Sequence, residues 1–286
     1  NPADVLFSDN IFTYFIRERV NYMNLQKVQY DVVDGIAVIT MNWAKNLNAI
    51  DETMASELLE VLDSAQNDDS VKVVVLKGLT KAFSAGGDIG YFYHLIQKGE
   101  KVDMEDLISK VGVLTERVKR VDKLVIASVS GAAAGAGASL ALSSDFIVCA
   151  DNARFLMAFV NMGLATDTGG MYLLSKQVGE KLAMELCITG RPLDAQEAKE
   201  RGIVYNVVPA AELEVETMKL AGKLAAGPLV AYKHIKRQAY AAVFGDYRNY
   251  LDNVEGNVQR ICSQTADFAE GVAAFIEKRK PQYQGK

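Results

Sequence analysis

The sequence contains few of the residues that bind metals or form cross-links. Among 286 residues there are three cysteines, Cys149, Cys187 and Cys262, and two histidines, His94 and His234. The cysteines form no CxxC pair, so neither a zinc site nor a disulfide framework is indicated. No Asp/Glu/His cluster has the spacing of metal ligands. We therefore expect a site without metal or bound cofactor, and cysteines that are reduced and buried.

The chain also lacks long apolar runs and any excess of positive charge. No run approaches the roughly 18 apolar residues that a membrane span needs, and no signal-peptide pattern is present. The net charge of −5 gives no electrostatic reason to expect nucleic-acid binding. Half of the residues are hydrophobic and 23% are charged, as in ordinary globular proteins. We expect a cytoplasmic protein that binds neither membranes nor nucleic acids.

Residues 1–22 differ from the rest of the chain, because they carry no start methionine, whereas Met23 opens a clear strand pattern. We expect this segment to be an N-terminal extension that is extraneous to the fold. The remaining residues are numerous enough for one large domain or two small ones.

Strand and helix patterns alternate through the first half of the chain. Residues 28–42 alternate apolar and polar side chains around Asp34-Gly35, which predicts a hairpin. Apolar runs predict three buried strands, at residues 71–76, 124–130 and 145–150. Helical spacing predicts helices at residues 52–65, 91–96, 104–121 and 136–143. This alternation indicates an α/β fold with a mainly parallel sheet.

After Gly170 the pattern becomes almost wholly helical, with glycines and the Gly227-Pro228 pair as boundaries. We expect a core at residues 23–225 and a helical C-terminal region at residues 226–286. The latter is interpreted as an appendage of the same domain or as an oligomer-forming layer.

Two turns rich in small residues each follow a predicted strand, at residues 84–87 and 135–138. Small residues let backbone N–H groups approach a ligand, and the second turn opens a helix whose N-terminus favours negative charge. Together the turns could supply two donors to one oxygen, which is an oxyanion hole. The alternative is that the small residues merely permit close packing.

A second functional interpretation uses the same glycines. Gly135-Ala-Gly137 lies between a strand and a helix, and Asp151 follows the next strand, as in a degenerate dinucleotide-binding fingerprint. Against it, the third small position is occupied by Leu140 and the helix is short.

Asp167 is the most informative single residue. It is the only carboxylate between Asp151 and Glu180, in a stretch of apolar, small or uncharged residues. Burial would raise its pKa toward the range useful for proton transfer. The alternative is an N-cap, because Asp is a good capping residue and an apolar run follows. No Gly-x-Ser-x-Gly elbow or Cys/His pair is present, so metal-free proton chemistry on a carbonyl-activated substrate remains.

The residues resemble one known family, the crotonase (enoyl-CoA hydratase/isomerase) superfamily, from about Met23 to the C-terminus. The motifs that carry the resemblance are, in order, Asn48-Ala49, Ala82-Phe-Ser-Ala-Gly-Gly-Asp88, Gly135-Ala-Gly137, Gly163-Leu164 with Gly169-Gly170, and Ala195-x-x-Ala198-x-x-x-Gly202. The resemblance implies a crotonase-like spiral of ββα units with a helical C-terminal trimerisation region, assembled as a homotrimer or hexamer. It also implies an acyl thioester substrate, on coenzyme A or acyl carrier protein, held by the N–H groups of Ala85 and Ala136.

Departures from the family pattern bear on the reaction. Hydratases of the family carry two glutamates, and the matching positions here are Ser139 and Phe159. Dienoyl-CoA isomerases carry acids at the positions of Phe159, Asn161 and Asp167, of which only the last is present. One aspartate at this place resembles the double-bond isomerases, most closely the trans-2/cis-3-enoyl acyl-carrier-protein isomerases. Isomerases of phenylacetate breakdown share this feature.

The resemblance therefore implies an isomerase of fatty acid metabolism that shifts a double bond in an acyl thioester. Asp167 would carry a proton between C4 and C2, and Phe159 would help to exclude water. The expected substrate-binding residues are Phe159, Tyr91, Phe92, Leu95 and Lys45. The alternatives are an enoyl-CoA hydratase and a catalytically inert acyl-CoA-binding protein of the same fold.

Overall fold

A computed structural model describes residues 23–79, 81–100 and 105–286 of the chain. The expected N-terminal extension, residues 1–22, lies outside the described residues.

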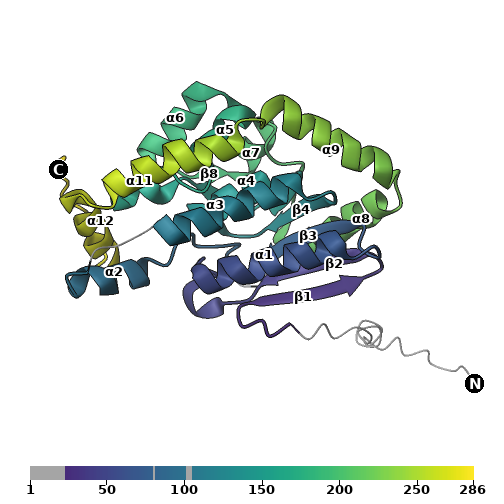
Figure 1. The fold of residues 1–286 in the computed structure, drawn as a ribbon, viewed down its shortest axis with the longest axis horizontal. Coiled ribbons are helices and arrows are strands. Elements are labelled where there is room, and N and C mark those ends of the chain that lie inside the picture. The colour runs from purple at the N-terminus through teal and green to yellow at the C-terminus, as the bar shows by residue number, and fades with distance from the viewer. Residues whose placement is uncertain (1–22, 80, 101–104) are drawn as a thin grey trace, which may run out of the picture.

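Within the described residues, the main sheet has the strand order β1-β2-β3-β4-β6-β9, of which Figure 1 labels β1 to β4. The strands are β1 (Val28–Val33), β2 (Ile36–Met41), β3 (Val73–Gly78), β4 (Leu124–Val129), β6 (Phe146–Ala150) and β9 (Asn206–Val208). Only the β1/β2 hairpin is antiparallel, while the remaining neighbours are parallel. Asp34 and Gly35 join the hairpin with φ of 52° and 79°, as a two-residue turn requires. The predicted hairpin and parallel core are confirmed.

A smaller sheet has the order β5-β7-β8, formed by β5 (Ala132–Ala134), β7 (Arg154–Leu156) and β8 (Leu193–Asp194). Neither these strands nor β9 were predicted from the sequence. They have two or three residues each, too few to show an alternating pattern. β5 follows β4 after a sharp turn and leads into the helix that begins at Ala136.

Helices cover both faces of the main sheet. Those of the core are α1 (Glu52–Asn67), α2 (Ile89–Gln97), α3 (Glu105–Arg120), α4 (Ala136–Ser143), α5 (Gly170–Val178), α6 (Glu180–Thr189), α7 (Ala195–Glu200) and α8 (Leu213–Ala225). Successive side chains of a strand point to opposite faces, so Val74 and Leu76 join the cluster that contains α1 and α3. Val73 and Val75 pack instead with α8.

Residues 229–276 are mostly helical. They form α9 (Leu229–Val243), α10 (Tyr247–Tyr250), a π-helical turn (Leu251–Glu255), α11 (Gly256–Cys262) and α12 (Ala266–Ile276). Residues 247–262 form one helix without a break, and its middle turn is a π turn. Figure 1 shows α11 next to α3, and α12 beside α2. The Phe92 and Phe268 rings meet edge to face across the α2–α12 contact, with centroids 6.2 Å apart.

None of the helices in the described ranges is long and apolar enough to cross a membrane. The three cysteines are free, as expected. Cys149 and Cys187 are buried, but Cys262 is partly exposed at the end of α11, contrary to the expectation.

Candidate active site

Two backbone segments meet where β3 and β5 end. We call residues 82–88 the donor loop and residues 131–137 the donor turn. The Ser84 N–H donates to the Ala132 carbonyl (3.2 Å) and the Ala134 N–H to the Ser84 carbonyl (2.9 Å). The buried Asn48 side chain donates to the Ala82 and Phe83 carbonyls at 3.2 and 3.3 Å. Backbone pairing and one amide therefore fix the two segments side by side.

Glycine is needed where these segments touch. A Cβ atom on Gly86 would lie 2.6 Å from the Ala134 carbonyl oxygen and 3.5 Å from the Ala136 nitrogen. A Cβ atom on Gly137 would lie 2.6 Å from the Ser84 Cβ. The small residues therefore do permit close packing, as the alternative interpretation held. This packing also brings the Ala136 N–H, at the start of α4, next to the donor loop.

The free N–H groups differ from the predicted pair. The Ala85 N–H donates to the Leu47 carbonyl at 2.9 Å, so it is already used inside the protein. The Gly86 N–H lies 3.2 Å from the Ser84 hydroxyl. In the described part of the chain, the N–H groups of Gly87 and Ala136 donate to no protein atom. The expectation for Ala85 therefore has to be corrected to Gly87, two residues along the same loop.

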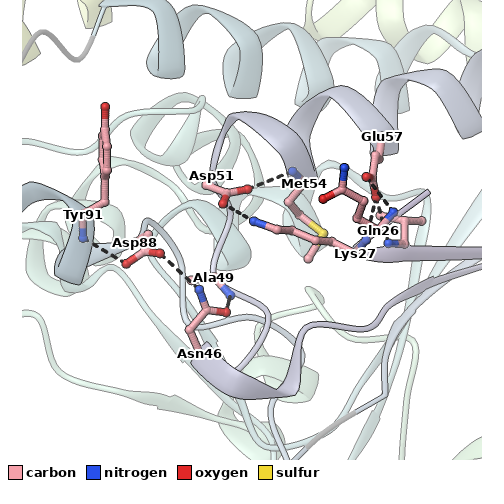
Figure 2. A network of polar contacts seen from close by, with 10 residues as sticks. Gln26, Lys27, Asn46, Ala49, Asp51, Met54, Glu57, Asp88 and Tyr91 are labelled. Atoms are coloured by element: carbon pink, nitrogen blue, oxygen red, sulfur yellow. Dashed lines mark hydrogen bonds and ion pairs between the residues drawn. The ribbon is translucent and has the colours of Figure 1, made fainter. Parts of the chain in front are cut away.

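The far end of the donor loop is held by side-chain caps (Figure 2). Asp88 accepts from the Tyr91 N–H at the start of α2 and from the Asn46 side chain, both at 3.2 Å. Asn46 in turn accepts from the Ala49 N–H at 3.2 Å. The loop is thereby tied to the short 3-10 helix Ala44–Asn46.

A second group in Figure 2 anchors the first strand to α1. Glu57 accepts the N–H groups of Gln26, Lys27 and Val28 at 2.8, 2.8 and 3.0 Å. Asp51 caps α1 through the Met54 N–H (2.9 Å) and pairs with Lys27. These contacts support the start of the fold and involve none of the predicted site residues.

Asp167 lies in a buried turn before α5. Asp167 is 5% exposed, and the Gln259 side-chain NH₂ donates to the Oδ2 atom of Asp167 at 2.7 Å. Burial raises the pKa of Asp167 to about 6, and the hydrogen bond from Gln259 limits the rise. Helix α5 has Gly169 as its N-cap and no side-chain cap. The capping hypothesis for Asp167 is therefore wrong, because its carboxylate is turned toward α11.

The backbone around Asp167 is unusual. We call residues 167–169 the acid turn. Thr168 and Gly169 have φ of 54° and 81°, both in the left-handed region. A Cβ atom on Gly169 would lie 1.8 Å from the Tyr247 hydroxyl oxygen. The Ser139 hydroxyl donates to the Asp167 carbonyl at 3.4 Å. Ser139, which matches the position of a glutamate in hydratases of the family, therefore supports the acid turn.

A second buried carboxyl group lies beside the acid turn. Glu255 is 2% exposed, and both its oxygens lie 2.9 Å from the Gly169 nitrogen. Burial raises its pKa to about 9, with a further contribution from the negative charge of Asp167. Asp167 is therefore isolated along the chain but not in space.

Sequence reasoning missed Glu255 and Gln259 because polar residues of a C-terminal helix look like surface residues. One signal was present: Tyr247, Leu251, Glu255 and Gln259 are spaced by four, and all are buried. In a regular α-helix each step of four drifts by about 40° around the axis. The wider π turn at Leu251–Glu255 offsets this drift and keeps the residues on one face.

The predicted substrate-binding residues fall into two groups. Phe159 is buried beside the donor turn, since its ring would lie 3.6 Å from a Cβ atom on Gly135. Phe92 is buried and would lie 3.5 Å from a Cβ atom on Gly87. Tyr91 is 52% exposed, Leu95 is partly buried and Lys45 is exposed. The structure thus brings Phe159 and Phe92 to the two donor segments and leaves Tyr91 and Lys45 on the surface.

The dinucleotide-binding interpretation does not fit this geometry. Gly135 follows β5 of the smaller sheet rather than a strand of the main sheet, and the donor loop occupies the space beside it. A pocket of about 790 Å³ between α3 and α9 contains none of the predicted site residues. Within the described ranges, no three His, Cys, Asp or Glu residues are grouped to hold a metal ion.

Comparison with known proteins identifies the family of the chain. Residues 31–286 match the family model described as enoyl-CoA hydratase/isomerase. The chain is 36% identical over 270 residues to a trans-2-decenoyl-[acyl-carrier-protein] isomerase of Streptococcus mutans, covering 92% of this chain and 100% of that protein. It is 35% identical over 256 residues to a 1,2-epoxyphenylacetyl-CoA isomerase of Escherichia coli, covering 89% and 97%.

Solved structures give the same result for the fold. An enoyl-CoA hydratase from Mycobacterium avium subsp. paratuberculosis superimposes with a TM-score of 0.82 at 30% identity, over 91% of this chain and 99% of that one. The expected crotonase fold with a helical C-terminal region is confirmed.

Proposed function

The chain belongs to the enoyl-CoA hydratase/isomerase family, and on that premise we propose that it moves a carbon–carbon double bond between the 2,3 and 3,4 positions of an acyl thioester in fatty acid metabolism. The observation that carries the proposal is the buried carboxylate of Asp167, in a turn that accepts the Ser139 hydroxyl of α4, the helix that begins at the free Ala136 N–H. The positions of the two hydratase glutamates hold Ser139 and Phe159.

The proton transfer would begin at Asp167. With its pKa raised to about 6, this carboxylate is ionised at neutral pH and still basic enough to accept a proton. It would take a proton from C4 of a 2-enoyl thioester, or from C2 of a 3-enoyl thioester, which leaves a dienolate. The protonated Asp167 then returns the proton at the other carbon. One carboxyl group is sufficient because no water is added.

The negative charge of the dienolate would be held by the N–H groups of Gly87 and Ala136. Ala136 begins α4, so its N–H points out of the positive end of that helix. A donor of this kind contributes about 3–4 kcal/mol to transition-state stabilisation. Phe159 lies beside the same turn, and its ring would exclude water from the dienolate.

The carrier of the acyl group is part of the proposal. Similarity to a trans-2-decenoyl-[acyl-carrier-protein] isomerase supports acyl carrier protein, and similarity to a 1,2-epoxyphenylacetyl-CoA isomerase supports coenzyme A. We favour an acyl-carrier-protein thioester of medium chain length. Turnover of one 10-carbon enoyl group on both carriers, under identical conditions, tests this choice.

We also propose that the chain assembles as a homotrimer or a hexamer. Val254, Val258 and Ile261 expose apolar side chains on the 247–262 helix, and Ile261 is 67% exposed. Such a surface is typical of an interface between subunits. Light scattering coupled to size-exclusion chromatography gives the mass of the particle, and a mass of one chain would contradict the proposal.

The reaction is tested by incubating the protein with a 2-enoyl and a 3-enoyl thioester in water enriched in ¹⁸O. We expect interconversion of the two isomers and no label in either. A 3-hydroxyacyl product that carries ¹⁸O would instead identify a hydratase. Binding of acyl thioesters without any product would identify an inert binding protein.

A further inference from the structure

We propose that Glu255 is a positioning residue for the proton-transfer site: its buried carboxyl group holds the Gly169 N–H and thereby fixes the acid turn against the C-terminal helix. The inference rests on the proposed function, because it assigns to Glu255 a role in presenting Asp167.

The geometry of the acid turn supports this role. Both Glu255 oxygens lie 2.9 Å from the Gly169 nitrogen, two residues after Asp167. One helical turn further along, Gln259 donates to Asp167 itself at 2.7 Å. Tyr247, on the same face, packs against Gly169 and bonds to Thr115 of α3 at 2.9 Å. The 247–262 helix therefore contacts the acid turn through three buried polar residues of one face.

The π turn makes these contacts possible. Glu255 is its last residue, and the widened backbone keeps Glu255 on the face that carries Tyr247 and Gln259. π turns inside α-helices are rare and occur often at functional sites. The structure thus uses an uncommon backbone feature to place a carboxyl group in a buried position.

The electrostatic surroundings decide the charge of this carboxyl group. Asp167 faces it from the acid turn, and Tyr247 and Tyr250 face it from its own helix. The nearby cation Arg248 is already bonded to Asp252 (2.8 Å) and to Glu116 of α3 (3.2 Å). The Gly169 N–H favours the ionised form of Glu255, but burial outweighs it and raises the pKa to about 9.

At neutral pH Glu255 is consequently an uncharged acid, while Asp167 is a carboxylate. An uncharged Glu255 can anchor the Gly169 N–H without repelling either Asp167 or the negative dienolate. Above about pH 9 it becomes an anion beside Asp167, and like charges disfavour each other's ionised forms. Asp167 stays ionised at this pH, so the loss would come from repulsion between the Glu255 anion and the negative dienolate, and we expect turnover to fall in that range.

Glu255 also lines a pocket of about 270 Å³ with Ser109, Gly112, Arg248 and Asp252. The pocket places Glu255 next to a space large enough to hold water on the side of α3. The charge of Glu255 can therefore follow the pH of the solution even though the side chain is buried.

The test compares Glu255→Gln and Glu255→Ala with the wild-type enzyme across about pH 5 to 10. Glutamine has the shape of the uncharged acid and keeps an oxygen for the Gly169 N–H, so we expect kcat at pH 7 within about threefold of wild type. Wild-type turnover should fall above about pH 9, and this fall should be absent in Glu255→Gln. Glu255→Ala removes the anchor and should lower kcat by about 10- to 100-fold, the effect of a small misplacement of the base.

The matched control is Asp252→Asn, which removes a carboxylate from the same turn and pocket without touching the acid turn. It should keep the wild-type profile, including the fall at high pH. A profile of Glu255→Gln that superimposes on wild type would overturn the inference, as would full activity of Glu255→Ala.

A readout without turnover separates this inference from the proposed function. Infrared difference spectra between about pH 7 and pH 10 should show loss of a protonated carboxyl group in the wild type but not in Glu255→Gln. If wild type turns over thioesters and Asp167→Asn does not, the proposed function stands whatever Glu255 does. If wild type is inactive, the proposed function fails, and the spectra still report whether Glu255 is uncharged. Absence of the infrared change in wild type would overturn the inference even if Glu255→Ala fails to fold.

Discussion

The two sides of the candidate site are built in different ways. The donor loop and the donor turn are held by backbone hydrogen bonds and by glycines where they touch. The acid turn is held by side chains of a helix that lies about 90 residues further along the chain, since 86 residues separate Gly169 from Glu255 and 92 separate Asp167 from Gln259. The donor side therefore depends on the sheet core, whereas the charge of the acid depends on the C-terminal region. Substitutions on the donor side should therefore change the rate without shifting the pH profile, whereas substitutions around Asp167 should shift the pH profile.

The largest effect is expected from the acid side. Asp167→Asn keeps the shape of the side chain but removes the base, and general acid–base catalysis typically contributes about 10²- to 10⁴-fold, so we expect kcat to fall by about 10³-fold. The control is Asp151→Asn, an exposed aspartate in the turn after β6, which should retain full activity. Single-turnover rates on a 3-enoyl thioester measure both, and an Asp167→Asn rate near that of the control would contradict the mechanism.

The next effect is expected from the donor side. Gly86→Ala places a Cβ atom 2.6 Å from the Ala134 carbonyl, so the two donor segments must separate. We expect kcat/KM to fall by about 10²-fold, the effect of losing one oxyanion donor, with an unchanged pH profile. Gly99→Ala is the matched control, because Gly99 also has positive φ but no neighbour within 4 Å. A shifted pH profile in Gly86→Ala would show that the two sides are not separable.

A smaller effect is expected from Gln259→Met, which keeps the volume but removes the donor to Asp167. The hydrogen bond favours the carboxylate, so its loss should raise the pKa of Asp167 further. The rising limb of kcat/KM against pH should move to higher pH, and a rise of about one pKa unit would lower the ionised fraction of Asp167, and with it the activity at pH 6, by about fivefold. Gln196→Met, at an exposed site on α7, should leave the limb in place. A limb that stays in place in both variants would show that Gln259 does not act on Asp167.

An effect of a different kind is expected in stability. The pKa of Glu255 rises from 4.5 to about 9 on folding, so the folded state holds a proton that the unfolded state has released between these values. Its contribution to the free energy of unfolding is full below pH 4.5 and is lost as the pH rises toward about 9. The free energy of unfolding of Glu255→Gln should therefore fall less than that of wild type between about pH 5 and 9. Parallel curves from urea titrations would contradict the raised pKa.

The sequence predicted the donor side well because its signals are local. Asp34-Gly35, the strand at residues 124–130 and the helix at residues 136–143 each showed their own turn or periodicity. The error at Ala85 arose because only the fold shows that the Leu47 carbonyl already accepts its N–H.

The acid side could be predicted only in part. Burial of Asp167 followed from its apolar neighbours, but its partners Gln259 and Glu255 come from distant sequence and from a π turn that has no reliable local signature. The capping hypothesis failed for the same reason: tertiary contacts with α11 outcompete the local preference of Asp for a helix start.

The central claim, direct proton transfer by one buried aspartate, is tested most directly by isomerisation in D₂O. Asp167 is 5% exposed, so the proton that it accepts should return to the substrate before it exchanges with solvent. Mass spectrometry of product formed at early times should therefore find less than one deuterium per turnover at the carbon that receives the proton. Complete deuteration of that carbon from the first turnovers would contradict the account, because the proton would then come from water.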